Sequence, residues 1–212
     1  DAGSRSWQGI ASTPDFAKLA ATVAGDEIYF SVDGGTSWSA WTSAGVKNWR
    51  GIACSPDFAI LVAAAYGANA SGDNLYISYN GGVTWSVLTG AGIKTWMGVT
   101  ASPDFVKMAV CDSYGGYDYN TNSYYGGSIY ISSDSGVTWP ALTAAGNRSW
   151  QGIASSPDFT KLAASVSYGN IYLSIDSGAT WNSLSGAGSQ YWFGIAASPD
   201  FGKLVAVAPN AG

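Results

Sequence analysis

The sequence contains no histidine and only one glutamate, Glu27. Histidine titrates nearest neutrality and is the commonest general base and metal ligand. Its absence excludes catalytic triads that rely on it, so an acid–base pair would consist almost wholly of aspartates. The two cysteines, Cys54 and Cys111, are too few for a disulfide framework and lack metal-ligand spacing. We therefore expect no metal and no cofactor, and we interpret the cysteines as two buried small residues rather than as a single bridge.

Charge is scarce as well, since 11% of the 212 residues are charged against 47% that are hydrophobic. This balance is the opposite of that in disordered chains and predicts a folded protein. Nine basic residues, scattered singly in a chain of net charge −5, provide no basic patch for a nucleic acid. No apolar run approaches the ~18 residues of a membrane span. The chain starts at Asp1 without an initiator methionine, which suggests processing or fragmentation, and from this we expect a secreted, extracellular protein.

The sequence contains an internal repeat with two characteristic blocks. The first repeated block, W-x-G-[IV]-[AT]-x-[ST]-P-D-F, begins at Trp7, Trp49, Trp96, Trp150 and Trp192. The second block, S-x-[DN]-x-G-x-[ST]-W, ends at Trp38, Trp85, Trp139 and Trp181. Successive first blocks are 42, 47, 54 and 42 residues apart, near the ~40 to 50 residue period of propeller blades. We expect a single domain over residues 1–212, with repeats starting near 7, 49, 96, 150 and 192.

Each unit is typical of four short strands separated by turns. In the first unit the expected strands cover residues 7–12, 19–23, 27–31 and 37–42. Four strands in each repeat predict an all-β fold, a β-propeller of about five blades. A glycine two residues after each first-block tryptophan places that strand innermost, where backbones crowd together. The last unit stops after two strands, so the last blade is predicted to be incomplete, with an unpaired outer edge.

The second block resembles a known repeat. Its four copies, SVDGGTSW, SYNGGVTW, SSDSGVTW and SIDSGATW, are similar to the Asp-boxes of bacterial-neuraminidase-type repeat propellers. That class includes sialidases, sortilin-like receptors, photosystem assembly factors and several lectins. Within it the box forms the hairpin between the third and fourth strands, which implies a structural role for Asp33, Asn80, Asp134 and Asp176. Their side chains can accept N–H hydrogen bonds within a turn, in agreement with that role.

The resemblance also suggests an enzymatic interpretation, which the residues do not favour. Sialidases of this class use three arginines that clamp a carboxylate, a tyrosine with an adjacent glutamate, and an aspartic acid. Here Arg5 and Arg148 occupy the same repeat position, two residues before the tryptophan, and Arg50 follows its tryptophan. The lone Glu27 lies in an ordinary third strand. We expect no enzyme and no catalytic residue, and a degenerate glycosidase that uses two aspartates stays an alternative.

Two groups of aromatic residues are candidates for ligand binding. The first-block tryptophans lie near basic or amide groups, a combination that can hold a sugar ring, although packing between blades explains them equally well. The long insertion at residues 112–127 carries five tyrosines among glycine, asparagine and aspartate, a composition typical of binding loops. The predicted ligand-binding residues are Trp7, Trp49, Trp96, Trp150, Trp192, Tyr114, Tyr117, Tyr119, Tyr124 and Tyr125.

The function expected from these features is an extracellular, non-enzymatic carbohydrate-binding or adhesion module. Its partners would be glycans or cell-surface polymers. An alternative is a self-assembling structural protein that forms homo-oligomers or fibres by strand-edge pairing at its incomplete last blade. Asn69 and Asn147 each begin an N-glycosylation acceptor pattern, which matters only in a secreted eukaryotic protein.

Overall fold

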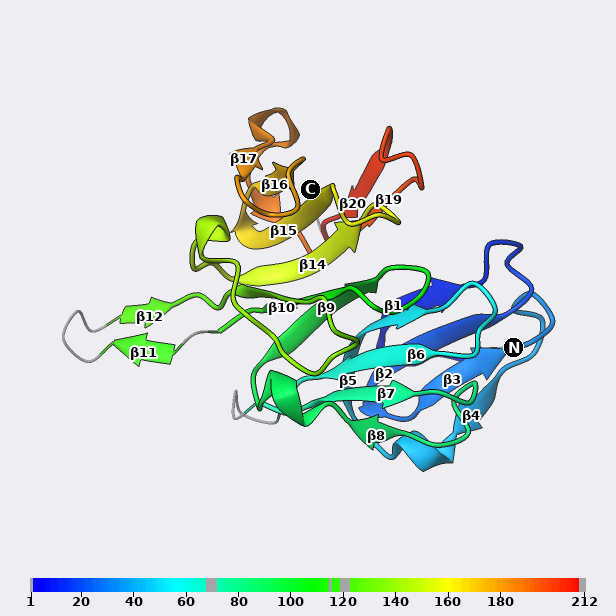
Figure 1. The fold of residues 1–212 in the computed structure, drawn as a ribbon. Helices are drawn as coiled ribbons and strands as arrows, with labels where there is room; N and C mark the ends of the chain where they lie inside the picture. The colour runs from blue at the N-terminus through cyan, green and yellow to red at the C-terminus, as the bar shows by residue number, and fades with distance from the viewer. Residues whose placement is uncertain (1, 68–71, 115, 119–122, 210–212) are drawn as a thin grey trace.

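Short antiparallel strands, each paired mainly with its neighbours in sequence, build almost the whole structure. The computed structural model describes residues 2–67, 72–114, 116–118 and 123–209, with the backbone alone at 116–118 and 123–125. The strands form successive blades around an axis, and Figure 1 shows them following one another from the blue N-terminal blade to the red C-terminal strands. The predicted all-β propeller fold is confirmed.

The blades follow the sequence repeat. The first contains β1 (Trp7–Ser12), β2 (Leu19–Asp26), β3 (Ile28–Ser31) and β4 (Ser39–Trp41). The second contains β5 (Lys47–Cys54), β6 (Leu61–Ala65), β7 (Leu75–Ser78) and β8 (Ser86–Val87). The third contains β9 (Trp96–Ala101), β10 (Met108–Asp112) and β13 (Ile129–Ser132), with a single bridge from Tyr130 to Ala141 as its outer edge. The fourth contains β14 (Trp150–Ser155), β15 (Leu162–Gly169), β16 (Ile171–Ser174) and β17 (Asn182–Ser183).

The fifth blade contains only β19 (Gly194–Ala197) and β20 (Leu204–Val207) among the described residues. Just before it, β18 (Gln190–Tyr191) pairs with β15 of the fourth blade. The start of β5 pairs with the end of β2 in the same way. A one-turn 3-10 helix lies in each connection between successive blades: η1 (Thr42–Ala44), η3 (Thr89–Ala91), η4 (Thr143–Ala145) and η5 (Ser185–Ala187). These helices and strand pairs connect each blade to the next along the chain.

Glycine allows the first strands to meet at the axis, as predicted. A Cβ atom on Gly51 would lie 2.6 Å from the Met97 carbonyl oxygen and 3.0 Å from the Gly98 Cα. A Cβ on Gly98 would lie 2.9 Å from the Gly152 Cα. Any side chain at these positions would push neighbouring blades apart, because each of these contacts is with backbone.

The core consists of layers between blades. We call the face of a blade toward the preceding blade its front and the face toward the following blade its back. Alternate residues of β6 point to the two faces: Leu61 packs at the front with the first blade, and Val62 packs at the back with the third. Three buried clusters fill the interfaces between the first four blades. The period of two along a strand thus supplies both faces of every blade.

An inserted hairpin leaves the third blade between its second and third strands, where the extra length was expected. Its strands are β11 (Gly116–Asp118) and β12 (Ser123–Tyr125), which project away from the blades in Figure 1. At its base the buried carboxylate of Asp112 accepts hydrogen bonds from the Thr95 hydroxyl and, at 3.1 Å, from the Tyr114 backbone N–H. These bonds hold the root of the hairpin against the third blade.

Aspartates of the second block organise the outer turns. Asp134 Oδ1 accepts hydrogen bonds from the Ser132 hydroxyl at 2.8 Å and the Thr138 N–H at 2.9 Å. Its Oδ2 accepts one from the Thr138 hydroxyl at 2.6 Å. These bonds, of which that from the Thr138 hydroxyl has the largest effect, hold the pKa of Asp134 at about 2. Asn80 makes the same turn with an amide, accepting from the Thr84 N–H at 2.9 Å.

Aspartates in the turns of both repeated blocks predict a loss of stability in acid. Hydrogen bonds lower the pKa of eight aspartates below the ordinary 3.8: Asp15, Asp33, Asp57, Asp104, Asp134, Asp158, Asp176 and Asp200. A carboxylate with a lowered folded-state pKa contributes stability above its unfolded pKa and loses it as the pH falls through the folded value. We therefore expect the melting temperature to fall between about pH 4 and pH 2.

Thermal unfolding followed by circular dichroism across this pH range measures the effect. Burial raises the pKa of Asp112, so this carboxyl group favours the folded state as the pH falls. It is one group against eight with lowered pKa, and the net effect of acid stays a loss of stability. The matched variant is Asn80→Asp, which adds a ninth carboxylate to an equivalent turn and should steepen the loss. A melting temperature that stays constant from pH 5 to pH 2 would contradict the prediction.

Candidate functional site

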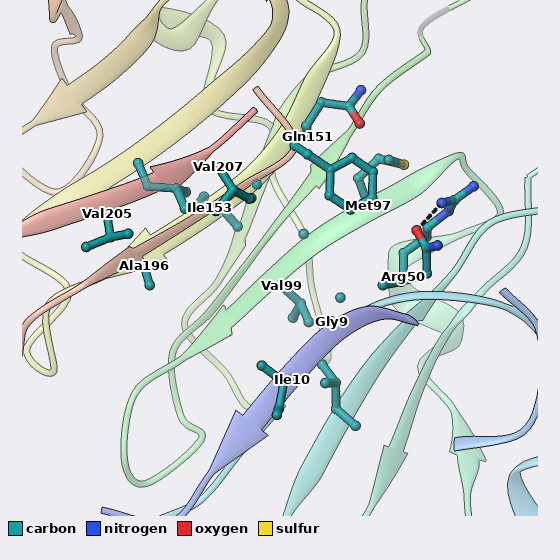
Figure 2. Close-up of a pocket in the computed structure, with 18 residues that line it drawn as sticks. Gly9, Ile10, Arg50, Met97, Val99, Gln151, Ile153, Ala196, Val205 and Val207 are labelled. Atoms are coloured by element: carbon teal, nitrogen blue, oxygen red, sulfur yellow. Dashed lines mark hydrogen bonds between the residues drawn. The ribbon is translucent and has the colours of Figure 1, made fainter. Parts of the chain in front are cut away.

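A cavity of about 300 Å³ lies on the axis, where the first strands of the blades converge. Figure 2 shows Arg50, Met97 and Gln151 on one side of it, and Ile10, Ala196 and Val205 on the other. One end of the cavity is therefore polar and the other aliphatic.

The residues that directly follow the first-block tryptophans line this end of the cavity, and three of the five are polar: Gln8, Arg50, Met97, Gln151 and Phe193. The strand pairing is irregular at this point of the repeat, with register shifts between Trp7 and Gly9 and between Trp150 and Gly152. A bulge of this kind turns the side chain of the extra residue away from its usual face. The repeat thus gathers one side chain from each blade around the axis.

A second hollow, of about 340 Å³, continues from the polar end of the cavity. We call it the polar cup. It is lined by Arg50, Tyr66, Met97, Ser113, Tyr114, Ser149, Gln151, Ser167, Tyr191 and Phe193. The two hollows share Arg50, Met97, Gln151 and Phe193. Aromatic side chains, hydroxyl groups and one cation therefore line a single space.

Arg50 is the charged group of the polar cup. Its guanidinium lies 5.1 Å from the centre of the Tyr66 ring and donates a hydrogen bond to the Gln8 side-chain oxygen. Its Nε is buried without a hydrogen-bond partner, and no carboxylate of the described residues forms an ion pair with it. Burial lowers the pKa of Arg50. A half-buried cation without a counter-charge favours a ligand that brings an acidic group or a strong hydrogen-bond acceptor.

Three of the predicted ligand-binding tryptophans are not accessible. Trp49, Trp96 and Trp150 have no exposed surface. Each packs edge-on against a third-strand tyrosine of its own blade, with ring centres 5.2, 5.4 and 5.5 Å apart. A sugar cannot reach a fully buried ring, so sugar binding at these three residues is corrected to packing between blades. Trp7 and Trp192 lie at the two ends of the array and are only half-buried.

The basic residues two positions before these tryptophans pack over tyrosine rings. Arg5 lies 4.3 Å from the centre of the Tyr29 ring and forms an ion pair with Asp26 at 3.4 Å. Arg148 lies 4.3 Å from the centre of the Tyr172 ring. Lys47 and Lys94 occupy equivalent places over Tyr76 and Tyr130. Of the three arginines, Arg50 alone lines the axial cavity or the polar cup.

The tyrosines of the insertion are placed unequally. Tyr114 lines the polar cup. Tyr117, Tyr124 and Tyr125 belong to the hairpin β11–β12, whose backbone alone is described, and Tyr119 lies outside the described residues.

Sequence reasoning missed Tyr66, Tyr191 and Arg50 as site residues. A signal for Arg50 was present, because it is the one charged side chain among the five that follow a first-block tryptophan.

The remaining reactive and modifiable groups lie apart from the cup. Both cysteines are free, and burial raises the pKa of Cys111 to about 12 and that of Cys54 to about 11, so both stay protonated and inert. The second-block aspartates occupy outer turns.

Of the two asparagines that begin a glycosylation pattern, Asn147 is exposed, whereas Asn69 lies outside the described residues. Within the described part of the chain, no cluster of three histidine, cysteine or acidic residues could hold a metal ion.

Comparison with solved structures places the fold among β-propellers. The structure resembles one chain of a nidogen/laminin complex with a TM-score of 0.75 and 14% identity, covering 96% of this chain and 72% of that one. For the GH74 xyloglucanase from Xanthomonas campestris the TM-score is 0.66 and the identity 16%, covering 98% of this chain and 35% of that one. For YCF48 from Cyanidioschyzon merolae the TM-score is 0.60 and the identity 16%, and the match covers 90% of this chain and 59% of that one.

At such identities the likeness defines the fold alone. The chain spans about a third of the length of the xyloglucanase and under two thirds of YCF48. No protein-family model matches the sequence, and a search of curated proteins finds no match. None of the described helices is long and apolar enough to cross a membrane.

Proposed function

We propose that this propeller is an extracellular, non-enzymatic binding module that holds an acidic carbohydrate in the polar cup. The observation that carries the proposal is the half-buried guanidinium of Arg50, which has no carboxylate partner among the described residues. An acidic sugar would supply the missing charge. The rings of Tyr66, Tyr114 and Tyr191 would pack against its apolar faces, as aromatic side chains do in sugar sites.

The chemistry of the lining supports binding rather than hydrolysis. Cleavage of a glycosidic bond ordinarily needs two carboxyl groups that flank it. Among the described residues, neither an aspartate nor a glutamate lines the axial cavity or the polar cup. Among the similar structures, one is titled a xyloglucanase and one a nidogen/laminin complex, so the same fold occurs in an enzyme and in a protein complex. A degenerate glycosidase remains the enzymatic alternative.

We also propose that the second-block turns are Asp-boxes. The hydrogen bonds among Ser132, Asp134 and Thr138 recur among Ser174, Asp176 and Thr180 with nearly the same lengths. They satisfy backbone N–H groups of the turn, which supports a structural role for these residues.

The variant Arg50→Gln tests the carbohydrate site. We expect at least about a tenfold weaker affinity for an acidic oligosaccharide, because a charge-assisted hydrogen bond contributes about 1.5–3 kcal/mol. Binding is measured on an array of neutral and acidic glycans, followed by calorimetry with the strongest acidic glycan. Arg5→Gln is the matched control, since it removes the same charge from a residue that lines neither the cavity nor the cup.

Three outcomes would contradict the proposal. They are an array on which the protein binds nothing, an equal loss of affinity in the two variants, and release of product from fluorogenic glycosides. The last result would favour the degenerate glycosidase.

Self-association is a second candidate function, favoured by side chains at the two ends of the array. Ile10 is 66% exposed, whereas its equivalent Ile52 is 6% exposed. At the other end Val205 is 66% exposed, whereas its equivalent Val62 is fully buried. Exposed positions that the other blades cover are typical of surfaces that meet another molecule. Sedimentation of the protein alone distinguishes monomers from oligomers or fibres.

A further inference from the structure

Asp112 departs from the repeat at a buried position. It lies opposite Trp96 at the end of β10. The residues in the same position of the first, second and fourth blades are Val23, Ala65 and Val166. All four side chains are buried, and Asp112 is the one charged residue among the buried residues that the structure describes. No lysine or arginine of the described residues forms an ion pair with it, so the repeat's apolar residue is replaced by a carboxylate without a cation.

The carboxylate holds the start of the insertion. Asp112 Oδ1 accepts hydrogen bonds from the Thr95 hydroxyl and, at 3.1 Å, from the Tyr114 N–H. The Thr95 hydroxyl oxygen also accepts from the Tyr114 N–H, at 3.0 Å. By accepting the hydroxyl proton of Thr95, the carboxylate leaves the lone pairs of that oxygen for the Tyr114 N–H. Asp112 and Thr95 therefore act together on one backbone group.

The fourth blade has a tyrosine at the same point of the repeat but no carboxylate. Tyr114 and Tyr168 each follow a serine whose N–H donates to the carbonyl of the residue before the first-block tryptophan, at 3.2 and 2.9 Å. Tyr168, whose blade has Val166 in place of Asp112, is 81% exposed and does not line the polar cup. Tyr114 is half-buried and lines it. A long insertion follows Tyr114, so the bonds to its N–H fix where its ring points.

The pKa of Asp112 shows that this arrangement does not serve stability. Burial raises the pKa of Asp112, and the bonds from Thr95 and Tyr114 and the charge of Lys94 offset this only in part. A carboxyl group whose pKa is higher in the folded state loses its stabilising contribution as the pH rises through that value. At neutral pH the ionised carboxylate therefore lowers the stability of the fold. Residues that lower stability in this way are typical of functional positions.

We propose that Asp112 is a positioning residue, which holds Tyr114 in the wall of the polar cup through the Tyr114 N–H. This role rests on the proposed carbohydrate site, because Tyr114 lines the cup together with Arg50. Asp112 lines neither the cup nor the axial cavity, so it acts on a ligand through Tyr114 and not directly.

The variant Asp112→Val, which introduces the valine of the first and fourth blades, tests this role. At neutral pH we expect a melting temperature equal to or above that of the unaltered protein, because an apolar residue often replaces a buried charge without loss of stability. Affinity for the strongest acidic glycan of the array should fall about fivefold, as the contact with the Tyr114 ring is lost. Loss of a negative charge near an acidic ligand would by itself strengthen binding. A residue with a purely structural role would instead lose stability and affinity together.

Two further variants show whether Asp112 acts through Tyr114. Tyr114→Ala should weaken glycan binding by a similar factor, and Asp112→Val added to it should cause no further loss, because the two side chains act as one unit. Asp112→Asn keeps an oxygen that can accept from Thr95 and Tyr114, so it should restore most of the affinity.

Amide hydrogen exchange followed by NMR examines the same contact without a ligand. Asp112→Val should speed exchange of the Tyr114 N–H several-fold, since this group loses an acceptor. The Tyr66 N–H is the matched control, because it donates to the Asn48 carbonyl at 2.8 Å and should exchange as before.

The role of Asp112 would be refuted by a lower melting temperature of Asp112→Val at neutral pH, by additive losses in the double variant, or by unchanged exchange at Tyr114. Unchanged glycan affinity in Asp112→Val would also refute it and would leave the carbohydrate site intact. An unaltered protein that binds no glycan would instead contradict the carbohydrate site. The melting temperature and the exchange rate would then still decide whether Asp112 positions Tyr114.

Discussion

Trp96→Ala is expected to lower the free energy of unfolding by about 3–5 kcal/mol, the range for truncation of a large buried aromatic side chain. Trp96 has no exposed surface and lies between the second and third blades. Its ring packs edge-on against Tyr130 at 5.4 Å, and its indole N–H donates to the Gly92 carbonyl at 3.3 Å. Alanine would leave a cavity between the second and third blades. The strands on its two sides cannot move in to close it, because each is hydrogen-bonded to other strands of its own blade.

Chemical denaturation at neutral pH measures this loss. Trp192→Ala is the matched control, since it removes the same side chain from the same repeat position in the fifth blade. Because Trp192 is only half-buried, its truncation should cost less than half as much as that of Trp96. Equal losses in the two variants would contradict the difference in burial between Trp96 and Trp192 that the structure shows.

Gly51→Ala is expected to lower the free energy of unfolding by about 1–3 kcal/mol, although the change adds a single methyl group. Its Cβ would lie 2.6 Å from the Met97 carbonyl oxygen and 2.8 Å from the Val99 nitrogen. Both contacts are with backbone, so no side-chain rotation can relieve them. The second and third blades would have to separate at the axis.

The control for this variant is Gly194→Ala, at the same position of the fifth blade. There, among the described residues, the new methyl group would meet only the Val207 side chain, at an ordinary 3.5 Å. We expect its unfolding free energy to change by no more than about 0.5 kcal/mol. Gly51→Ala should also weaken glycan binding, because separation of the blades moves Arg50. Equal stability of the two variants would contradict close approach of the first strands.

The polar cup shows how a repeat protein acquires an asymmetric site. The residue after each first-block tryptophan lines the axial cavity, whatever its chemistry, and in the first four blades the strand pairing is irregular at this point. Only one of the five, Arg50, carries a charge. Tyr66 and Tyr114 add aromatic surface at the start of the two longer loops. The scaffold is therefore shared by all blades, whereas the proposed specificity depends on departures from the repeat.

The sequence predicted the fold well because its signals are local and repeated. A block that recurs five times, with turn residues at constant offsets, specifies strands and turns without knowledge of distant contacts. The predicted third strand began one residue early, at Glu27 instead of Ile28. The fourth strand of the third blade is reduced to one bridge at Ala141, directly after Pro140. Proline lacks the N–H that a strand ladder needs.

The candidate site was predicted less well, because burial and proximity across blades are not local. Trp49 and Trp7 share one sequence context, yet one is fully buried and the other half-buried. The difference arises because another blade covers the front of the second blade, whereas no described residue fills that position on the first. Tyr191 directly precedes a first-block tryptophan and carried no signal of its own. It joins Arg50 in the cup only when the fourth and fifth blades are in place.

The sequence by itself determined the strands, the turns and the glycine-lined axis, because turn chemistry and the two-residue period of a strand act between near neighbours. Tertiary structure alone decided which tryptophans a ligand can reach and which arginine lines the polar cup. Those properties depend on what lies on the far side of each blade, and identical repeats acquire different surroundings only when they are assembled around an axis.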